Sequence, residues 1–161
     1  MRTQTWRSIV FFAAGLGLIV SLFAAAEFFD AALRNICSVS SVISCAAVDQ
    51  SGRTTTLGIP DYAWGIGGFI AILILAGIAE RRPSVHQWTW GLLGLTTVGV
   101  ALSLYLLYVE IALIGALCLV CACAYFLGVV AWVGAIGLVR RGPEAVEGTD
   151  AEDAAAASVD E

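Results

Sequence analysis

The stretch SLYLLYVEIALIGALCLVCACAY, residues 103–125, decides how this chain folds. It lies inside a longer segment, residues 83–139, in which Glu110 is the only charged residue. With a rise of about 1.5 Å per residue, one helix of that length would far exceed the roughly 30 Å hydrocarbon core of a bilayer. The segment is therefore predicted to turn back near Glu110 and to form two spans, about Trp88–Val109 and about Ile114–Leu138.

The composition indicates that the chain folds in lipid. Of its 161 residues, 60% are hydrophobic and 13% are charged, against roughly 25% charged in soluble domains. Two further uncharged runs, Ser8–Ala26 and Tyr62–Ala79, each fit one membrane crossing. The first run could be a signal peptide, but no cleavage site is convincing, so a retained helix is expected. The predicted fold class is an all-α integral membrane protein, a four-transmembrane-helix bundle with an extracytoplasmic loop after the first helix.

The basic residues, all eight of them arginine, orient the predicted bundle. Three pairs flank the predicted helices on one side, and only two arginines lie in the loop on the other side. An excess of basic residues marks the cytoplasmic side, so we expect a multi-pass plasma-membrane protein with both termini in the cytoplasm. The pairs are Arg2 with Arg7, Arg81 with Arg82 and Arg140 with Arg141, and the loop arginines are Arg34 and Arg53.

Two regions are predicted along the chain. Residues 1–141 form the four-helix transmembrane domain. Residues 142–161 are rich in acidic residues and alanine and lack any basic or aromatic residue, so they cannot bury a core and are expected to form a disordered acidic cytoplasmic tail. His86, the only histidine, falls on the cytoplasmic side, and we expect an interfacial role for it.

Four of the five cysteines are predicted to share one membrane surface. Cys37 and Cys45 fall in the loop after the first helix, within CSVSSVISC. Cys118 and Cys121 fall in the first turns of the fourth helix, which enters the membrane from the same side. That side is the oxidising one for a bacterial plasma membrane, where thiols can be kept as disulfides. Cys123 points to another helical face and is interpreted as apolar filler.

The chemistry of these cysteines has three possible interpretations. Cysteine is often buried as a small hydrophobic residue, yet a second pair on the same side argues against mere filler. A four-thiolate zinc or iron–sulfur site is a weaker alternative, because the C-x7-C spacing of Cys37 and Cys45 is unlike a zinc knuckle. The CxxC of Cys118 and Cys121 places both sulfurs on one helical face near a helix N-terminus, an arrangement that favours thiolates and disulfide exchange.

At these residues the chain resembles the vitamin K epoxide reductase family, whose bacterial members reoxidise periplasmic disulfide catalysts. The resemblance covers about residues 8–139 and includes CSVSSVISC, GIPDYAWGIGGF at the start of the second helix, and LCLVC in the last helix. It implies a quinone-dependent redox domain that uses a menaquinone-type or ubiquinone-type quinone as electron acceptor. Since some members carry a fused thioredoxin-like domain and this chain has an acidic tail instead, a separate extracytoplasmic thioredoxin-like carrier is expected as the partner.

The resemblance also assigns roles to the cysteines. Cys121 would lie against the quinone and pass electrons to it. Cys118 would pair with Cys121 and exchange with Cys45, and Cys37 would be the outermost thiol, which takes electrons from the reduced partner. No metal ion has a place in this scheme.

Three further residues are candidates for the quinone pocket. Tyr125, four residues after Cys121, matches a family tyrosine near the quinone ring, although a buried aromatic residue could also seek any hydrogen bond. Asp61 stands where many relatives have asparagine. It could donate to a quinone oxygen only when protonated, and the alternative is a helix N-cap. Trp64 could form a wall of the pocket or simply lie at the membrane interface.

Three other functions are considered for a membrane protein with these cysteines. A vitamin K epoxide reductase proper would use the same four cysteines on an epoxide. The disulfide bond formation protein B family is also a four-span quinone reductase, but its CxxC lies in the first outer loop, unlike the CxxC here. A non-enzymatic membrane subunit would need no cysteine pairs, so Cys121→Ala would be silent.

Overall fold

The computed structural model describes residues 3–38, 40, 42–52, 55–56, 58–81 and 87–141. The predictions made for some residues fall outside this part of the chain: Arg2, Arg53, Arg82, His86 and the tail 142–161. The side chains of Arg34 and Arg141 also lie outside the description.

Within the described residues the structure has four long helices: α1 (Thr3–Phe29), α4 (Asp61–Arg81), α5 (Gln87–Tyr108) and α6 (Leu119–Arg141). Each is long and apolar enough to cross a bilayer, and α5 is extended by a π-helix, η1 (Val109–Ile114). A helix satisfies its own backbone hydrogen bonds, which lipid cannot do. The prediction of a four-helix membrane bundle is confirmed.

Short elements connect α1 to α4. They are the helices α2 (Ala31–Ile36) and α3 (Cys45–Gln50) and the strands β1 (Thr55–Thr56) and β2 (Ile59–Pro60). The strands pair antiparallel, with Thr55 opposite Pro60. This ribbon leads directly into α4.

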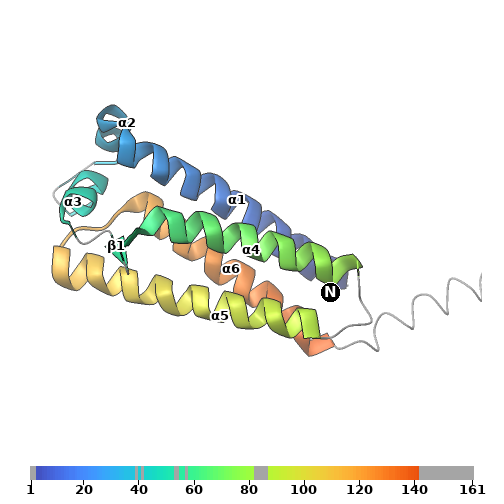
Figure 1. Cartoon of the computed structure of the whole chain (residues 1–161). Helices are drawn as coiled ribbons and strands as arrows, with labels where there is room; N and C mark the ends of the chain where they lie inside the picture. The colour runs from blue at the N-terminus through green and yellow to red at the C-terminus, as the bar shows by residue number, and fades with distance from the viewer. Residues whose placement is uncertain are drawn as a thin grey trace, which may run out of the picture.

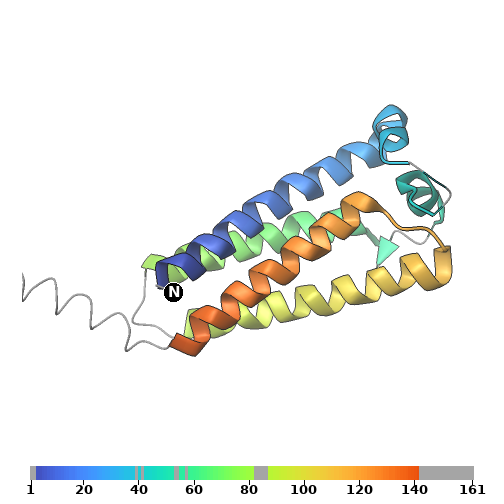
Figure 2. The ribbon, with the colours of Figure 1, turned by 180° about the vertical axis from the view of Figure 1, so that it is seen from behind.

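The four long helices form a closed ring. Helix α1 packs against α4 and α6, and α5 packs against the same two helices. The short elements gather at one end of the bundle with η1 and the start of α6, while the start of α1 and the end of α6 lie at the other end (Figure 1 and Figure 2). Since α4 ends and α5 begins at that second end, the helix termini that carry Arg7, Arg81 and Arg140 share one end of the bundle.

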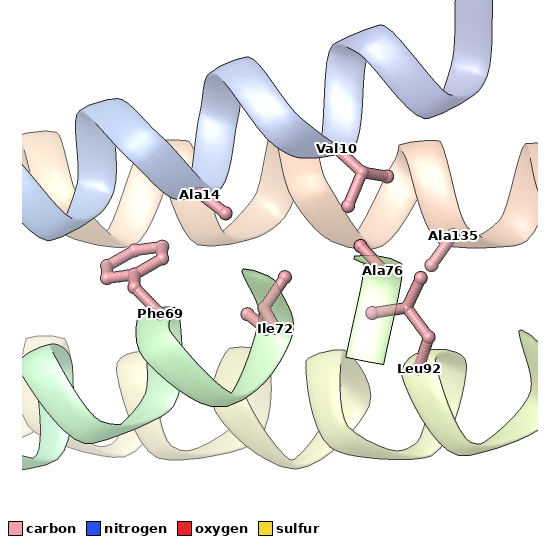
Figure 3. Close-up of a cluster of buried hydrophobic side chains, with 7 residues drawn as sticks. All are labelled: Val10, Ala14, Phe69, Ile72, Ala76, Leu92 and Ala135. Carbon is pink, nitrogen blue, oxygen red and sulfur yellow. The ribbon is translucent and has the colours of Figure 1, made fainter. Parts of the chain in front are cut away.

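A buried apolar cluster joins all four helices (Figure 3). Apart from the aromatic Phe69, its members are small or branched side chains: Val10, Ala14, Ile72, Ala76, Leu92 and Ala135. Small residues let the helices approach closely, as membrane helices require. At Gly137 a Cβ atom would overlap the indole ring of Trp6, and at Gly17 it would overlap the ring of Phe69. Glycine at these points is what allows α1 to contact α6 and α4.

The predicted turn between the last two spans is wrong by several residues. The chain does not turn at Glu110, which lies in η1, but at Gly115, whose φ of 75° falls in the left-handed region that favours glycine. The last helix begins at Leu119 rather than near Ile114, so Cys118 directly precedes it. The prediction failed because it treated a charged residue as a sign of a turn, whereas the Glu110 side chain is buried and hydrogen-bonded.

Candidate functional site

The loop cysteines form a disulfide at the end of the bundle that holds the short elements. Cys37 directly follows α2, and Cys45 is the first residue of α3. The Ser44 hydroxyl caps α3 by accepting a hydrogen bond from the backbone N–H of Ala47 at 3.1 Å. Cys37 and Cys45 are joined by a disulfide with their Cα atoms 5.6 Å apart. Both residues are buried.

Backbone pairing fixes this loop against the turn that precedes α6. Ile43 and Leu117 form a parallel β-bridge. The Leu117 N–H donates to the carbonyl of Val42 at 2.7 Å, and the Ser44 N–H donates to the carbonyl of Leu117 at 3.2 Å. The residues that follow these hydrogen bonds, Cys45 on one segment and Cys118 on the other, are thereby brought side by side.

The resulting sulfur cluster has a free thiol against a disulfide. The Sγ atoms of Cys118 and Cys45 are 3.3 Å apart. Cys118 and Cys121 are free cysteines, and the Cys121 N–H donates to Sγ of Cys118 at 3.3 Å. This hydrogen bond comes from the first turn of α6, where backbone N–H groups lack partners within the helix, and it strengthens when the sulfur is charged. The arrangement suits thiol–disulfide exchange between Cys45 and Cys118.

The same cluster can be compared with a metal site. The sulfurs of Cys37, Cys45 and Cys118 all lie within 4.8 Å of one another. Metal binding needs deprotonated thiolates, and two of these sulfurs are joined in a disulfide. With the loop disulfide formed, the cluster has one free thiol, Cys118, next to a disulfide, as thiol–disulfide exchange requires. Cys123 is exposed on α6, and it is not a member of this group of three.

A cavity of about 150 Å³ lies next to the cysteines, between the four long helices, α3 and η1. Its wall is mainly apolar, with aromatic residues from α1 and α4 and small residues where the helices approach. Cys121 lines it, as do all three residues predicted for the pocket, Asp61, Trp64 and Tyr125. The structure thus brings these predicted residues together around one space; Cys118 is not among the lining residues.

Glu110 is the residue of this site that the sequence interpretation missed. Its side chain is 4% exposed and lines the cavity. The Tyr125 hydroxyl donates to Oε1 at 2.8 Å, and the Cys118 N–H donates to Oε2 at 3.0 Å. The signal was present in the sequence, because an ionisable residue alone in a membrane span is by default a functional candidate.

Asp61 is the first residue of α4 and connects this helix to the ribbon. Its Oδ1 accepts a hydrogen bond from the Thr56 hydroxyl at 2.7 Å, and the Trp64 indole N–H donates to the Thr56 carbonyl at 3.2 Å. Asp61 and Trp64 therefore hold β1 against the start of α4, and both of them line the cavity. A carboxylate in the first turn also interacts favourably with the helix dipole. Whether Asp61 also donates to a ligand stays a prediction.

Ser21 provides a test of what could bind in the cavity. Its side chain is 3% exposed and lines the cavity, and in the part of the chain that the structure describes its hydroxyl has no hydrogen-bond partner. It lies against Gly65, where a Cβ atom would come within 2.7 Å of the hydroxyl oxygen. A buried hydroxyl without a partner is costly. A ligand with an apolar ring and carbonyl oxygens, such as a quinone, fits this mixture of apolar wall and unused donor.

A known protein family matches most of the chain. Residues 8–136 match the sequence model of the Vitamin K epoxide reductase family. The matched segment contains all four long helices, apart from the first residues of α1 and the last residues of α6, and all five cysteines.

Proposed function

The chain belongs to the vitamin K epoxide reductase family, and from this premise we propose that it generates disulfides by passing electrons from a thioredoxin-fold protein to a quinone. Membership of the family identifies the chain as a membrane thiol oxidoreductase. The observation that carries the finer proposal is the 3.3 Å contact between Cys45 of the loop disulfide and Cys118, next to a cavity lined by Cys121.

The relay begins at the loop. A thiolate of the reduced partner attacks Cys37, and the Cys37–Cys45 bond breaks to give a mixed disulfide between the partner and Cys37. The second thiol of the partner then displaces Cys37, so the partner leaves oxidised and the loop is left with two thiols. Cys37 follows a short helix and is 8% exposed, so a small movement of the loop would be enough to present it.

The second exchange occurs inside the protein. The Cys45 thiolate attacks Cys118 of a Cys118–Cys121 disulfide, and Cys121 leaves as a thiolate. Cys37 then attacks Cys45 and releases Cys118, which restores the loop disulfide and leaves Cys118 and Cys121 reduced. The state described by the structure, with an oxidised loop beside two free cysteines, corresponds to the end of this step.

The cavity residues serve the last step. A bound quinone would supply a two-electron, two-proton acceptor whose potential draws the relay in one direction. Cys121 would face it from α6, and Cys118 would close the disulfide as the electrons leave. Tyr125, Ser21 and Asp61 would hold its oxygens, while Trp64 and the apolar wall would pack against its ring.

The orientation in the membrane is part of the proposal. The arginine-bearing end of the bundle would face the cytoplasm of the cell that carries the protein, and the cysteine end would face the oxidising side of its plasma membrane. A membrane-impermeant thiol reagent tests this on intact cells. Ala47→Cys on α3 should be labelled without lysis, and Gln87→Cys at the start of α5 only after lysis. The reverse pattern would overturn the orientation.

The proposed reaction is tested with purified protein in detergent. A reduced thioredoxin-fold protein and a short-chain quinone are mixed with it, and quinone absorbance is followed. Quinone should be reduced by the wild type and by Cys123→Ala, but not by Cys118→Ala or Cys121→Ala. Full activity in either of the last two variants would refute the relay. Turnover of a quinone epoxide without turnover of the quinone would favour an epoxide reductase proper.

A further inference from the structure

The cavity is lined by a buried carboxyl group, that of Glu110, to which the relay gives no role. Glu110 is buried at the end of the third span, in η1, and each of its oxygens has a different partner. Tyr125 donates to Oε1 through its hydroxyl, and Cys118 donates to Oε2 through its backbone N–H. One side chain therefore connects the exchanging cysteine to the tyrosine that lines the cavity.

These partners determine where a proton on Glu110 can lie. A backbone N–H can only donate, so Oε2 has to act as an acceptor in both protonation states of the carboxyl group. The carbonyl-type oxygen of a protonated carboxyl group is the better acceptor, so this contact favours a proton on Oε1, which faces Tyr125. In that state the hydrogen bond reverses: Oε1–H donates to the Tyr125 oxygen, and the O–H group of Tyr125 is released to donate elsewhere.

The two states differ in what Tyr125 offers to the cavity. With ionised Glu110, the only proton of the Tyr125 hydroxyl is held by the carboxylate, and the tyrosine can only accept. With protonated Glu110, the tyrosine can donate to a ligand oxygen. Asp61 and Asp49 also line this cavity, from α4 and α3, but the Tyr125 hydroxyl bonds Glu110 directly.

We propose, on the basis of the quinone reduction proposed above, that Glu110 is a positioning residue that acts through Tyr125. It sets the direction of the Tyr125 hydroxyl and replaces the proton that this hydroxyl gives to a quinone oxygen. The same carboxyl group accepts a hydrogen bond from the Cys118 backbone, so Glu110 positions both Tyr125 and one cysteine of the pair that reduces the quinone.

The protons and electrons balance. Oxidation of the Cys118 and Cys121 thiols to a disulfide releases two electrons and two protons, and reduction of a quinone to a hydroquinone takes up the same number. The Tyr125 O–H bond breaks as its proton passes to a quinone oxygen, and the Oε1–H bond of Glu110 breaks as that proton passes to Tyr125. The Glu110 carboxylate then takes up one proton released by the thiols. The other thiol proton reaches the second quinone oxygen through water.

Glu110→Gln separates positioning from proton supply. The glutamine amide oxygen can accept from the Cys118 N–H, and its N–H₂ group can donate to the Tyr125 oxygen, which leaves the Tyr125 O–H free but without a proton source behind it. We expect kcat for quinone reduction to fall about 100-fold, while KM for the quinone changes by no more than about twofold. Glu80→Gln, exposed at the opposite end of α4, is the matched control and should be unchanged.

Two readouts besides turnover complete the test. The infrared spectrum of the wild-type protein should contain the carbonyl band of a protonated, buried carboxyl group, and the spectrum of Glu110→Gln should lack it. The rate at which a small dithiol reduces the Cys37–Cys45 disulfide should match that of the wild type, which shows that the variant is folded.

A double-mutant cycle with Tyr125→Phe decides whether Glu110 acts through the tyrosine. The double variant should lose no more activity than the more damaged single variant. The inference would be overturned if the losses of the two single variants multiplied in the double variant. It would also be overturned if kcat of Glu110→Gln stayed within about twofold of wild type, or if the carboxyl band persisted in this variant. A wild type that fails to reduce any quinone would instead refute the proposed function.

Discussion

At the scale of single residues, the contact between Cys45 and Cys118 joins two parts of the chain that are far apart in sequence. The separation of 3.3 Å between the sulfurs lets either cysteine attack the other with little movement. Cys118 is also the residue whose backbone bonds Glu110 and whose sulfur receives the N–H of Cys121. Cys118 therefore contacts the loop disulfide, the first turn of α6 and the carboxyl group that bonds Tyr125.

Cys37→Ser should trap the internal exchange partner. Without Cys37 no thiol attacks Cys45 to release Cys118, and only the return of Cys121 to Cys118 competes, so a fraction of the protein should hold a Cys45–Cys118 disulfide on oxidation. Non-reducing peptide mapping by mass spectrometry detects the bond. The double variant Cys37→Ser/Cys118→Ser is the control and should lack it. Cys45 found bonded to Cys121 instead would contradict the order of the relay.

Ser21→Ala should weaken quinone binding without weakening the fold. The hydroxyl has no partner within the described residues, so its loss removes a buried polar group and should leave the unfolding temperature equal or higher. Loss of one hydrogen bond to the quinone should raise KM by about two- to tenfold.

Ser103→Ala is the matched control for this change. Ser103 also lines the cavity, but its hydroxyl already donates to the Gly99 carbonyl at 2.9 Å. Its replacement should leave KM for the quinone unchanged. Equal effects of the two variants would show that Ser21 has no particular part in binding.

Residue chemistry could be predicted from the sequence only in part. The four relay cysteines and Tyr125 were proposed from their spacing and from the family resemblance, and the structure gathers them at one end of the bundle. Glu110 was used only to locate a turn, and Ser21 gave no signal. The orientation of a side chain in a ring of uniformly apolar helices depends on packing, which periodicity cannot show when all faces are hydrophobic.

At the scale of elements, the parallel bridge between the loop and the turn before α6 positions the exchange. It depends on backbone groups of Val42, Ser44 and Leu117 rather than on side chains. No sequence pattern of so short a pairing could have been recognised in advance. The start of α6 could not be predicted either. Charged residues at the ends of uncharged runs indicated the number of spans, but they placed the start of this helix near Ile114 instead of at Leu119.

Leu117→Pro should slow transfer between the two cysteine pairs. Proline removes the N–H that bonds the Val42 carbonyl at 2.7 Å, just outside α6, so the helix itself is spared. A hydrogen bond worth about 1 kcal/mol implies about a fivefold slower transfer. The rate is measured on protein in which both disulfides are formed. A reduced thioredoxin-fold protein is added to reduce the loop, samples are quenched with acid at intervals, and the disulfides are mapped.

Leu117→Ala keeps the N–H and serves as the control. It should transfer electrons at close to the wild-type rate. A proline variant as fast as the alanine variant would mean that the bridge does not hold the cysteines together.

Gly137→Ala should destabilise the packing of α1 on α6. The new Cβ would overlap the indole of Trp6, and overpacking of this kind lowers the free energy of unfolding by about 1–3 kcal/mol. Gly94→Ala, where no atom lies within 4 Å of the new Cβ, is the control and should be neutral. Unfolding in mixed micelles measures both, and equal stability of the two variants would contradict the described packing.

At the scale of the whole molecule, the ring of helices divides into two functional ends. The apolar cluster joins the four helices, and the cavity, the disulfide and the free thiols lie together where the short elements cover the bundle. The number of spans and the gathering of four cysteines followed from hydrophobic runs and charge placement. The way the loop folds inward to bury Cys45 did not, because it is set by tertiary contacts.

The most direct test of the complete relay is a count of thiols in a single turnover. Fully reduced protein is mixed with an excess of short-chain quinone without oxygen, and the remaining thiols are counted and mapped. The relay predicts that about two equivalents of quinone are reduced, since each disulfide yields two electrons, and that Cys37–Cys45 and Cys118–Cys121 form while Cys123 stays free. Oxidation that stops at Cys118 and Cys121, or no loss of thiols at all, would contradict it.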